Sequence, residues 1–103
     1  MSEPTLSQQV MVTNEVGLHL RPAGMFVKCA GQFDSKIEVI KSDERAGGES
    51  VLDLVALGAG QGTELLIEAT GHDAQAALAA LTELFERGFA EDESSDRQEA
   101  ENP

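Results

Sequence analysis

The hydrophobic periodicity of this chain switches repeatedly between that of a strand and that of a helix. Side chains alternate between faces in a strand and recur every three to four residues on one face of a helix, so each switch marks a new element. Strand-like segments are 9–13, 36–41 and 63–69, and helix-like segments are 22–31, 50–57 and 73–88. This order predicts an α+β fold in which helices cover one face of a mainly antiparallel sheet.

Proline, glycine and capping residues define the predicted element boundaries. Pro22 is expected to open the first helix, and Gly31 to end it. Segment 50–57 fits either a buried strand or a short helix, but Ser50 followed by Asp53 resembles a capping box, which favours two turns of helix. The polar segment 42–48 predicts a turn with at most a short edge strand.

The last predicted helix carries a continuous apolar stripe. Asp73 is expected to cap it, because Asp is a preferred residue at helix N-termini. The helix is expected to end near Gly88. Its stripe comprises Ala74, Ala77, Leu78, Leu81, Leu84 and Phe85.

Charge and composition exclude several classes of partner. Lys and Arg number 7 against 19 Asp and Glu, giving a net charge of -12, which is the wrong sign for nucleic acid or anionic membranes. Trp and Tyr are absent, which argues against stacking on bases. The single cysteine, Cys29, permits no internal disulfide and is expected to be a small buried hydrophobe. No long apolar run marks a signal peptide or membrane span, so a cytoplasmic location is expected.

The chain is long enough for one domain, which we expect to span residues 1–89. Residues 90–103 hold six acidic residues, one basic residue and no large apolar side chain. Such a segment cannot bury enough apolar surface to offset the entropy of ordering, so an acidic disordered tail is predicted.

One short segment joins a histidine, a cation and a helix start. His19 and Arg21 immediately precede Pro22, and a helix N-terminus offers free N–H groups and positive potential to an anion. A neutral imidazole is a nucleophile, and an arginine fork matches phosphate oxygens. The arrangement suits reversible phosphoryl transfer onto histidine, although it also fits a helix-capping histidine. His72 is interpreted as a loop residue at the next helix start.

The run from Asn14 to Ala23 closely resembles the active-site motif of the HPr family, the histidine-containing phosphocarriers of the bacterial phosphoenolpyruvate-dependent phosphotransferase system. Segment 50–58 is similar to the family's second helix with its regulatory serine, and 61–63 with 68–71 to its last strand and turn. The resemblance covers roughly residues 8–89, and the closing Leu84 to Phe89 is similar to the nitrogen-related NPr branch.

The resemblance implies an HPr-like open-faced β-sandwich with a four-stranded antiparallel sheet and three helices on one face. His19 would accept a phosphoryl group at Nδ1 from phosphorylated Enzyme I and pass it to a histidine of an Enzyme IIA domain, with Arg21 steadying the group. The protein would be a covalent carrier, not a turnover enzyme, and would need no cofactor or metal. A monomer is expected, because one surface must stay free for both partners.

The resemblance also implies regulatory and docking roles. Ser50 would be a phosphorylation site for an HPr kinase/phosphorylase, although an N-cap serine is an equally simple interpretation. Partner contacts would involve the apolar residues Leu20, Val51, Leu52 and Val55, although such residues can also be core. We predict that Leu20, Val51 and Leu52 are surface anchors, and that Leu54 is core.

Acidic residues depart from the family pattern. HPr proteins commonly surround this surface with lysines, whereas Glu49 and Asp53 stand at such positions here. Two alternatives to a sugar-transport carrier remain open. One is a regulatory HPr relative in nitrogen or carbon metabolism that acts through protein contacts and Ser50 phosphorylation. The other is a small α+β binding module without phosphoryl chemistry.

Overall fold

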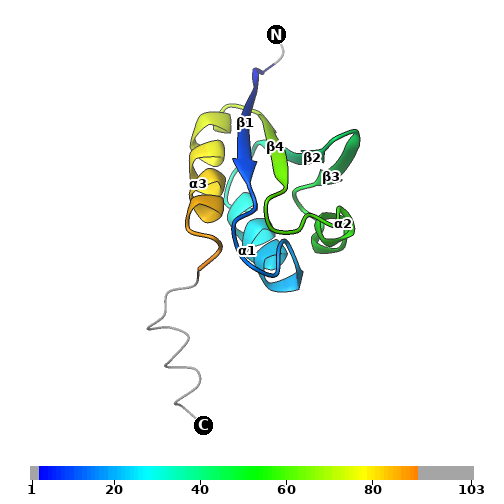
Figure 1. Cartoon of the computed structure of the whole chain (residues 1–103). Coiled ribbons are helices and arrows are strands. Elements are labelled where there is room, and N and C mark those ends of the chain that lie inside the picture. The colour runs from blue at the N-terminus through cyan, green and yellow to red at the C-terminus, as the bar shows by residue number, and fades with distance from the viewer. Residues whose placement is uncertain (1–2, 91–103) are drawn as a thin grey trace, which may run out of the picture.

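The computed structural model describes residues 3–90 and has four strands and three helices. All three helices lie on one side of the sheet (Figure 1). The arrangement confirms the predicted α+β class and the open-faced sheet. In chain order the elements are β1 (Thr5–Met11), α1 (Leu20–Ala30), β2 (Lys36–Lys41), β3 (Glu44–Gly47), α2 (Val51–Ala56), β4 (Glu64–Thr70) and α3 (Ala74–Glu86).

The sheet has the strand order β1-β4-β2-β3, and every pairing is antiparallel. Central β4 pairs with β1 through Ile67 opposite Gln8, and with β2 through Ile67 opposite Val39. Alternate β4 residues Leu65, Ile67 and Ala69 are buried, because every second side chain of a strand points to the helix-covered face. The predicted turn at 42–48 contains the short edge strand β3.

The core lies between the sheet and the helices. All six residues of the predicted α3 stripe are buried, which confirms the helical spacing. Phe85 is central in this core, since its ring packs edge-on against Phe26 at a centroid distance of 6.1 Å and against Phe89 at 4.7 Å. Phe89 is completely buried, so the chain is anchored beyond the end of α3.

The predicted start of α1 is wrong by two residues. The helix begins at Leu20 with His19 as its N-cap, not at Pro22. The first helical bond runs from the Ala23 N–H to the His19 carbonyl oxygen over 2.9 Å. Residues of the first helical turn have no acceptor within the helix for their N–H groups. Proline, which has no N–H, therefore fits at position 22 inside that turn. The histidine is therefore closer to the helix N-terminus than the sequence indicated.

The first strand also differs from its prediction, since it runs from Thr5 to Met11 and not over 9–13. Val10 and Val12 are both buried, as the alternation indicated. Val12 follows the strand and donates its N–H to the Thr63 carbonyl oxygen, so pairing continues locally into the loop before β4. Polar residues 7–9 concealed the earlier part of the strand from the apolar pattern.

Asp73 does not cap α3 with its side chain, although it occupies the N-cap position. Its carboxylate instead accepts hydrogen bonds from the Asp34 N–H, the Ser35 N–H and the Ser35 hydroxyl. The expected capping bond is replaced because this turn lies against the turn between α1 and β2, which supplies more donors.

Two further predictions concern the acidic tail and the absence of a membrane span. Ala90 is exposed, and the rest of the predicted acidic tail lies outside the described residues. Within 3–90, no helix combines the length and apolar character needed to cross a bilayer.

Candidate functional site

His19 stands at the junction between a loop and α1. Its backbone is extended, with φ −90° and ψ −164°, and its side chain makes no capping bond to the helix. Its imidazole is partly exposed. The backbone N–H groups of the following turn have no acceptors within the helix and give this end a partial positive charge. The helix start therefore presents a nucleophilic imidazole beside an anion-attracting backbone.

The loop before His19 is held against the segment between α2 and β4. Leu18 donates its N–H to the Ala59 carbonyl oxygen over 2.9 Å. Gly17 has a φ of +86°, and a Cβ there would lie 2.6 Å from the Ala59 oxygen. Only glycine fits this conformation and this approach without strain. The two loops therefore form one rigid support for the histidine.

Asn14 closes the same loop, a role that the sequence reasoning did not assign to it. Its Nδ2 donates to the Gly17 carbonyl oxygen over 2.7 Å, and the Gly17 N–H donates back to the Asn14 carbonyl oxygen over 3.2 Å. The Gly17 oxygen also accepts the His19 N–H over 2.9 Å. Asparagine is favoured in turns for such local bonds, and its spacing from the motif glycine was the available signal.

Arg21 lies in the first turn of α1, two residues beyond His19. Its Nη1 donates to the Phe89 carbonyl oxygen over 2.8 Å and lies 3.1 Å from Met25 Sδ. The side chain is therefore tied to the residue that follows α3 and its turn. Sequence reasoning identified Arg21 but not this anchor, because the contact joins residues 68 positions apart.

Ser50 is the N-cap of α2, as the capping-box pattern indicated. Its Oγ accepts the Asp53 N–H over 3.2 Å. At the other end of this short helix, Lys41 Nζ donates to the Leu57 carbonyl oxygen over 2.9 Å. Both ends of α2 thus have side-chain partners, which matters because six residues form too little helix to be stable alone.

The predicted partner-contact residues divide into two groups. Leu20 and Leu52 are strongly exposed, with exposed fractions of 62% and 74%. Val16, which was not among the predicted contact residues, is also 70% exposed. Val51 and Val55 are half-buried and pack partly against the core. Leu54 is fully buried, which confirms its assignment to the core.

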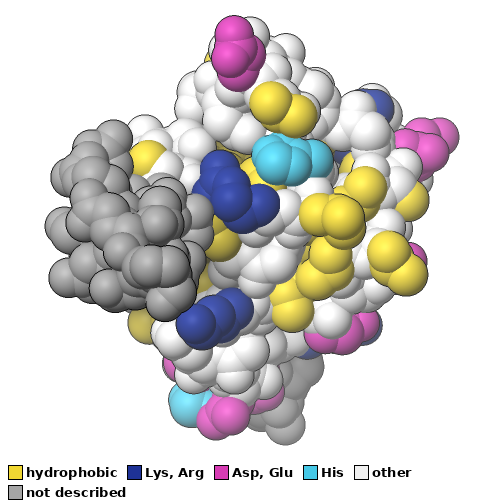
Figure 2. Space-filling view, turned by 90° about the horizontal axis from the view of Figure 1, so that it is seen from below, with side chains coloured by type: hydrophobic (Ala, Val, Ile, Leu, Met, Phe, Trp, Pro, Cys, Tyr) yellow, Lys and Arg dark blue, Asp and Glu magenta, His cyan; other side chains and the backbone are white. Residues whose placement is uncertain are grey.

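A shallow hollow connects the histidine loop with α2. It is lined by Val16, Leu18, His19, Val55 and the backbone of 58–60. Viewed from this side, the molecule shows a histidine with Lys or Arg side chains on one side and hydrophobic side chains on the other (Figure 2). The hollow therefore places His19, Val16 and Val55 of α2 on one surface.

Two other candidate residues have structural roles. Cys29 is partly buried and packs against the core, and burial raises the pKa of its thiol, which disfavours the reactive thiolate. His72 Nε2 lies 2.9 Å from Asp34 Oδ2, and Asp73 is close by. Hydrogen bonds within this group hold the α1–β2 turn against the β4–α3 turn, so the cluster has a structural explanation.

Comparison with known proteins agrees with this architecture. The family model described as the PTS HPr component phosphorylation site matches residues 6–87. Phosphocarrier protein HPr of Neisseria meningitidis is 39% identical over 88 residues, covering 85% of this chain and 99% of that protein. Phosphocarrier protein NPr of Escherichia coli is 38% identical over 90 residues, covering 85% and 99%. The crystal structure of HPr from Thermoanaerobacter tengcongensis superposes with a TM-score of 0.79 at 34% identity, covering 84% and 98%.

The fold and the matched region define a phosphocarrier protein of the phosphotransferase system. The chain belongs to the HPr family, which includes both the HPr and NPr relatives. Its identities to these two relatives are nearly equal.

Proposed function

We propose that His19 is the residue that carries the phosphoryl group, taking it from phosphorylated Enzyme I and passing it to a histidine of an Enzyme IIA domain. The observation that carries this proposal is the placement of His19 at the N-cap of α1, with no side-chain capping bond. Of the two histidines in the chain, His72 is paired with Asp34 in a different turn. Family membership supports the reaction, and this geometry supports His19 as the residue that takes part in it.

The proposed step is a displacement at phosphorus. The unprotonated Nδ1 of His19 attacks the phosphoryl group on the donor histidine, the donor N–P bond breaks, and its electron pair returns to the donor imidazole. The reverse sequence delivers the group to the acceptor. Because the phosphoryl group leaves again, His19 is regenerated, and the protein acts as a carrier.

Arg21 and the helix start are proposed to stabilise the transferred group. The guanidinium carries a permanent charge in a planar fork that matches phosphate oxygens, and its bond to the Phe89 oxygen restrains this side chain of the first turn. The N-terminal backbone of α1 adds N–H donors. The negative charge on the phosphoryl oxygens would thus meet donors that are already in place.

The surface formed by Leu20, Val51, Leu52 and Val55 is proposed to dock both partners. Leu20 and Leu52 offer large exposed apolar side chains, while the half-buried Val51 and Val55 link them to the core. Exposed apolar clusters of this kind are typical of protein interaction sites. Because one face serves both partners, we propose that the protein acts as a monomer, and that it acts in the cytoplasm with residues 1–89 as the phosphocarrier domain.

Ser50 is proposed to be a regulatory phosphorylation site for an HPr kinase/phosphorylase. Its position at the start of α2, beside the docking residues Val51 and Leu52, supports this. A phosphate there would add nearly two negative charges to the surface proposed to contact partners.

A second candidate function is that of a regulator of nitrogen or carbon metabolism. It is favoured by Glu49 and Asp53, which stand where lysines are common in the family.

The test is a reconstituted relay with phosphoenolpyruvate carrying labelled phosphorus. The chain is mixed with Enzyme I and then with candidate Enzyme IIA domains of the sugar and nitrogen branches from the same organism. We expect label to pass from Enzyme I to the chain and on to one branch, and to stop at Enzyme I in the His19→Ala variant. Label that bypasses His19 would contradict the assigned residue. Label that reaches the chain but no acceptor would favour the regulatory function.

A further inference from the structure

The surface around His19 has an uneven distribution of charge. Its apolar middle consists of Val16, Leu20 and Leu52, all more than half exposed. The basic residues beside it belong to α1, and the acidic residues belong to the start of α2. Figure 2 shows Lys and Arg side chains on one side of a histidine, hydrophobic side chains on the other, and acidic side chains at the rim of this face.

The basic side is provided by Arg21 and Lys28. They are seven residues apart in α1, so they project from the same side of the helix about two turns apart. Lys28 is exposed, in the last turn, and forms no ion pair within residues 3–90. Its charge is therefore available to an acidic group of a partner.

The acidic side is provided by Glu49 and Asp53, which flank Ser50 at the beginning of α2. Both are exposed, and neither forms an ion pair in the described part of the chain. Arg45 shares a hollow with Asp53, but it donates to Glu38 over 2.9 Å and to Glu68 over 3.1 Å.

Lys41, the other cation of this region, donates to the Leu57 carbonyl oxygen at the far end of α2. Both nearby cations thus have bonds of their own. Within residues 3–90, neither Glu49 nor Asp53 therefore has an ion-pair partner.

We infer that the phosphoryl donor carries a basic side chain opposite Asp53 and an acidic side chain opposite Lys28, on either side of an apolar contact with Leu20 and Leu52. The inference rests on the proposed function and specifies the chemistry of its partner. A uniformly acidic donor face would be attracted by Lys28 but repelled by Glu49 and Asp53, and complementary charges set both the rate and the register of docking.

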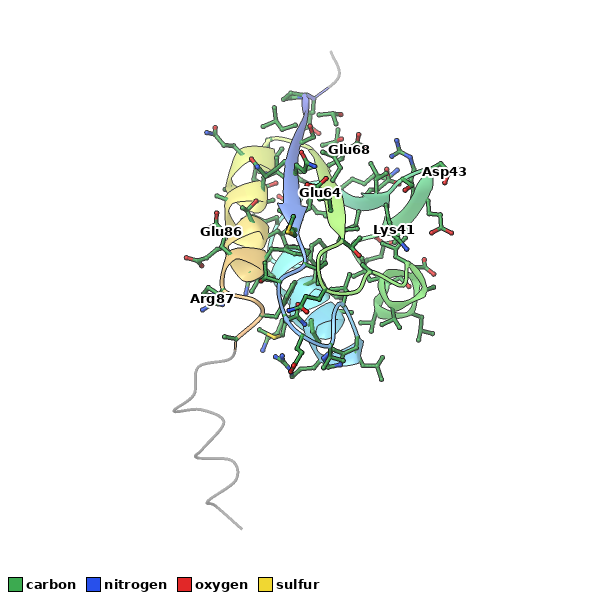
Figure 3. All side chains as sticks on the ribbon, viewed as in Figure 1. Lys41, Asp43, Glu64, Glu68, Glu86 and Arg87 are labelled. Atoms are coloured by element: carbon green, nitrogen blue, oxygen red, sulfur yellow. The ribbon has the colours of Figure 1, made fainter. Side chains whose placement is uncertain are left out.

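Charge reversals on the two sides test the inference. The rate of phosphoryl transfer from phosphorylated Enzyme I of the same organism is measured for Asp53→Lys and for Lys28→Glu. Glu86→Lys is the matched control, because it reverses an exposed charge on α3, across the molecule from α2 (Figure 3). Asp53→Asn and Lys28→Gln remove each charge more gently, and circular dichroism melting verifies that every variant is folded.

At low salt, we expect Asp53→Lys and Lys28→Glu each to slow transfer roughly 3- to 10-fold, since each replaces an attraction by a repulsion. The neutral variants should be slowed less, and Glu86→Lys should leave the rate unchanged. At about 1 M salt, where the Debye length is about 3 Å, the differences should largely disappear.

Faster transfer in Asp53→Lys would show a donor that is acidic on both sides and would overturn the inference. Unchanged rates in Asp53→Lys or Lys28→Glu would overturn it as well. Failure of the proposed function is distinguishable, because the unsubstituted chain would then accept no phosphoryl group from an active Enzyme I.

Discussion

Arg21 Nη1 donates a hydrogen bond to the Phe89 carbonyl oxygen over 2.8 Å, which joins the first turn of α1 to the residue that follows the last helix and its turn. Phe89 is fully buried, and its ring contacts Phe85 edge-on. The position of the guanidinium therefore depends on the hydrophobic core at the C-terminal end of the domain. This bond connects the proposed phosphoryl site with core packing.

Arg21→Lys should lower the rate of phosphoryl transfer through His19 at least 10-fold, or about 1.4 kcal/mol in barrier. Lysine keeps the positive charge but loses the planar fork that matches phosphate oxygens and the fixed geometry of the bond to Phe89. Rapid-quench kinetics with phosphorylated Enzyme I measures the rate. If Arg21→Lys transfers the phosphoryl group as fast as the unsubstituted chain, the geometry of the guanidinium is not needed for transfer.

Two glycines of the site region should respond oppositely to alanine. Gly17→Ala should destabilise the fold by more than about 1 kcal/mol, because φ is +86° and the new Cβ would lie 2.6 Å from the Ala59 oxygen. Gly24→Ala should stabilise it by up to about 1 kcal/mol, because Gly24 lies inside α1 with nothing within 4 Å of an added Cβ. Urea unfolding monitored by circular dichroism compares them. Equal effects would show that the histidine loop is not constrained as described.

Much of this fold was predictable from local pattern. The α3 stripe and the buried face of β4 follow directly from hydrophobic spacing, because tertiary packing uses the same faces that the sequence displays. The motif around His19 indicated the family correctly and marked the candidate site. Ser50 was likewise found correctly as an N-cap from its local pattern.

Long-range contacts account for what the sequence reasoning missed. The bonds from Arg21 to Phe89 and from Lys41 to Leu57 join elements that are distant in sequence, and no local pattern encodes them. Asp73 was predicted to cap α3 with its side chain, because no local pattern indicates that Ser35 lies beside it. The early part of β1 was missed because an edge strand can be mostly polar.

Ser50→Ala should reduce the free energy of unfolding by about 1 kcal/mol, because the Asp53 N–H loses its acceptor at the start of α2. Ser50→Asp is the matched control, since aspartate is also a good N-cap. It should preserve stability while adding a negative charge beside the proposed docking residues Val51 and Leu52. Thermal and urea unfolding of the three chains decide the point, and equal stability of Ser50→Ala and the unsubstituted chain would contradict the capping role.

The contribution of His72 to stability should depend on pH. The hydrogen bond with Asp34 and the charge of Asp73 raise the pKa of His72 above its usual value of 6.5, so the folded state favours the protonated ring. The resulting stabilisation is fully present below about pH 6.5 and is lost as the pH rises through the pKa in the folded protein. His72→Gln should therefore destabilise the chain at roughly pH 6 and much less at roughly pH 9. Urea unfolding at both values checks this, and a difference that grows with pH would contradict it.

Asp73 should show the opposite dependence. Hydrogen bonds from Ser35 and from the Asp34 N–H lower the pKa of this carboxyl below 3.8. Its stabilisation is present above pH 3.8 and is lost as the pH falls through the lowered pKa in the folded protein. Asp73→Asn should lose stability at neutral pH and approach the unsubstituted chain in strong acid. A constant difference across an acid titration followed by circular dichroism would count against this role.

His19 is the residue proposed to carry the phosphoryl group. Intact-mass spectrometry after incubation with phosphoenolpyruvate and Enzyme I from the same organism tests it most directly, with His19→Ala and His72→Ala compared in parallel. We expect the gain of one acid-labile phosphoryl group in the unsubstituted chain and in His72→Ala, and none in His19→Ala. Two results would contradict the role of His19. One is an unchanged mass of the unsubstituted chain when the same Enzyme I preparation phosphorylates another protein. The other is the gain of a phosphoryl group in His19→Ala.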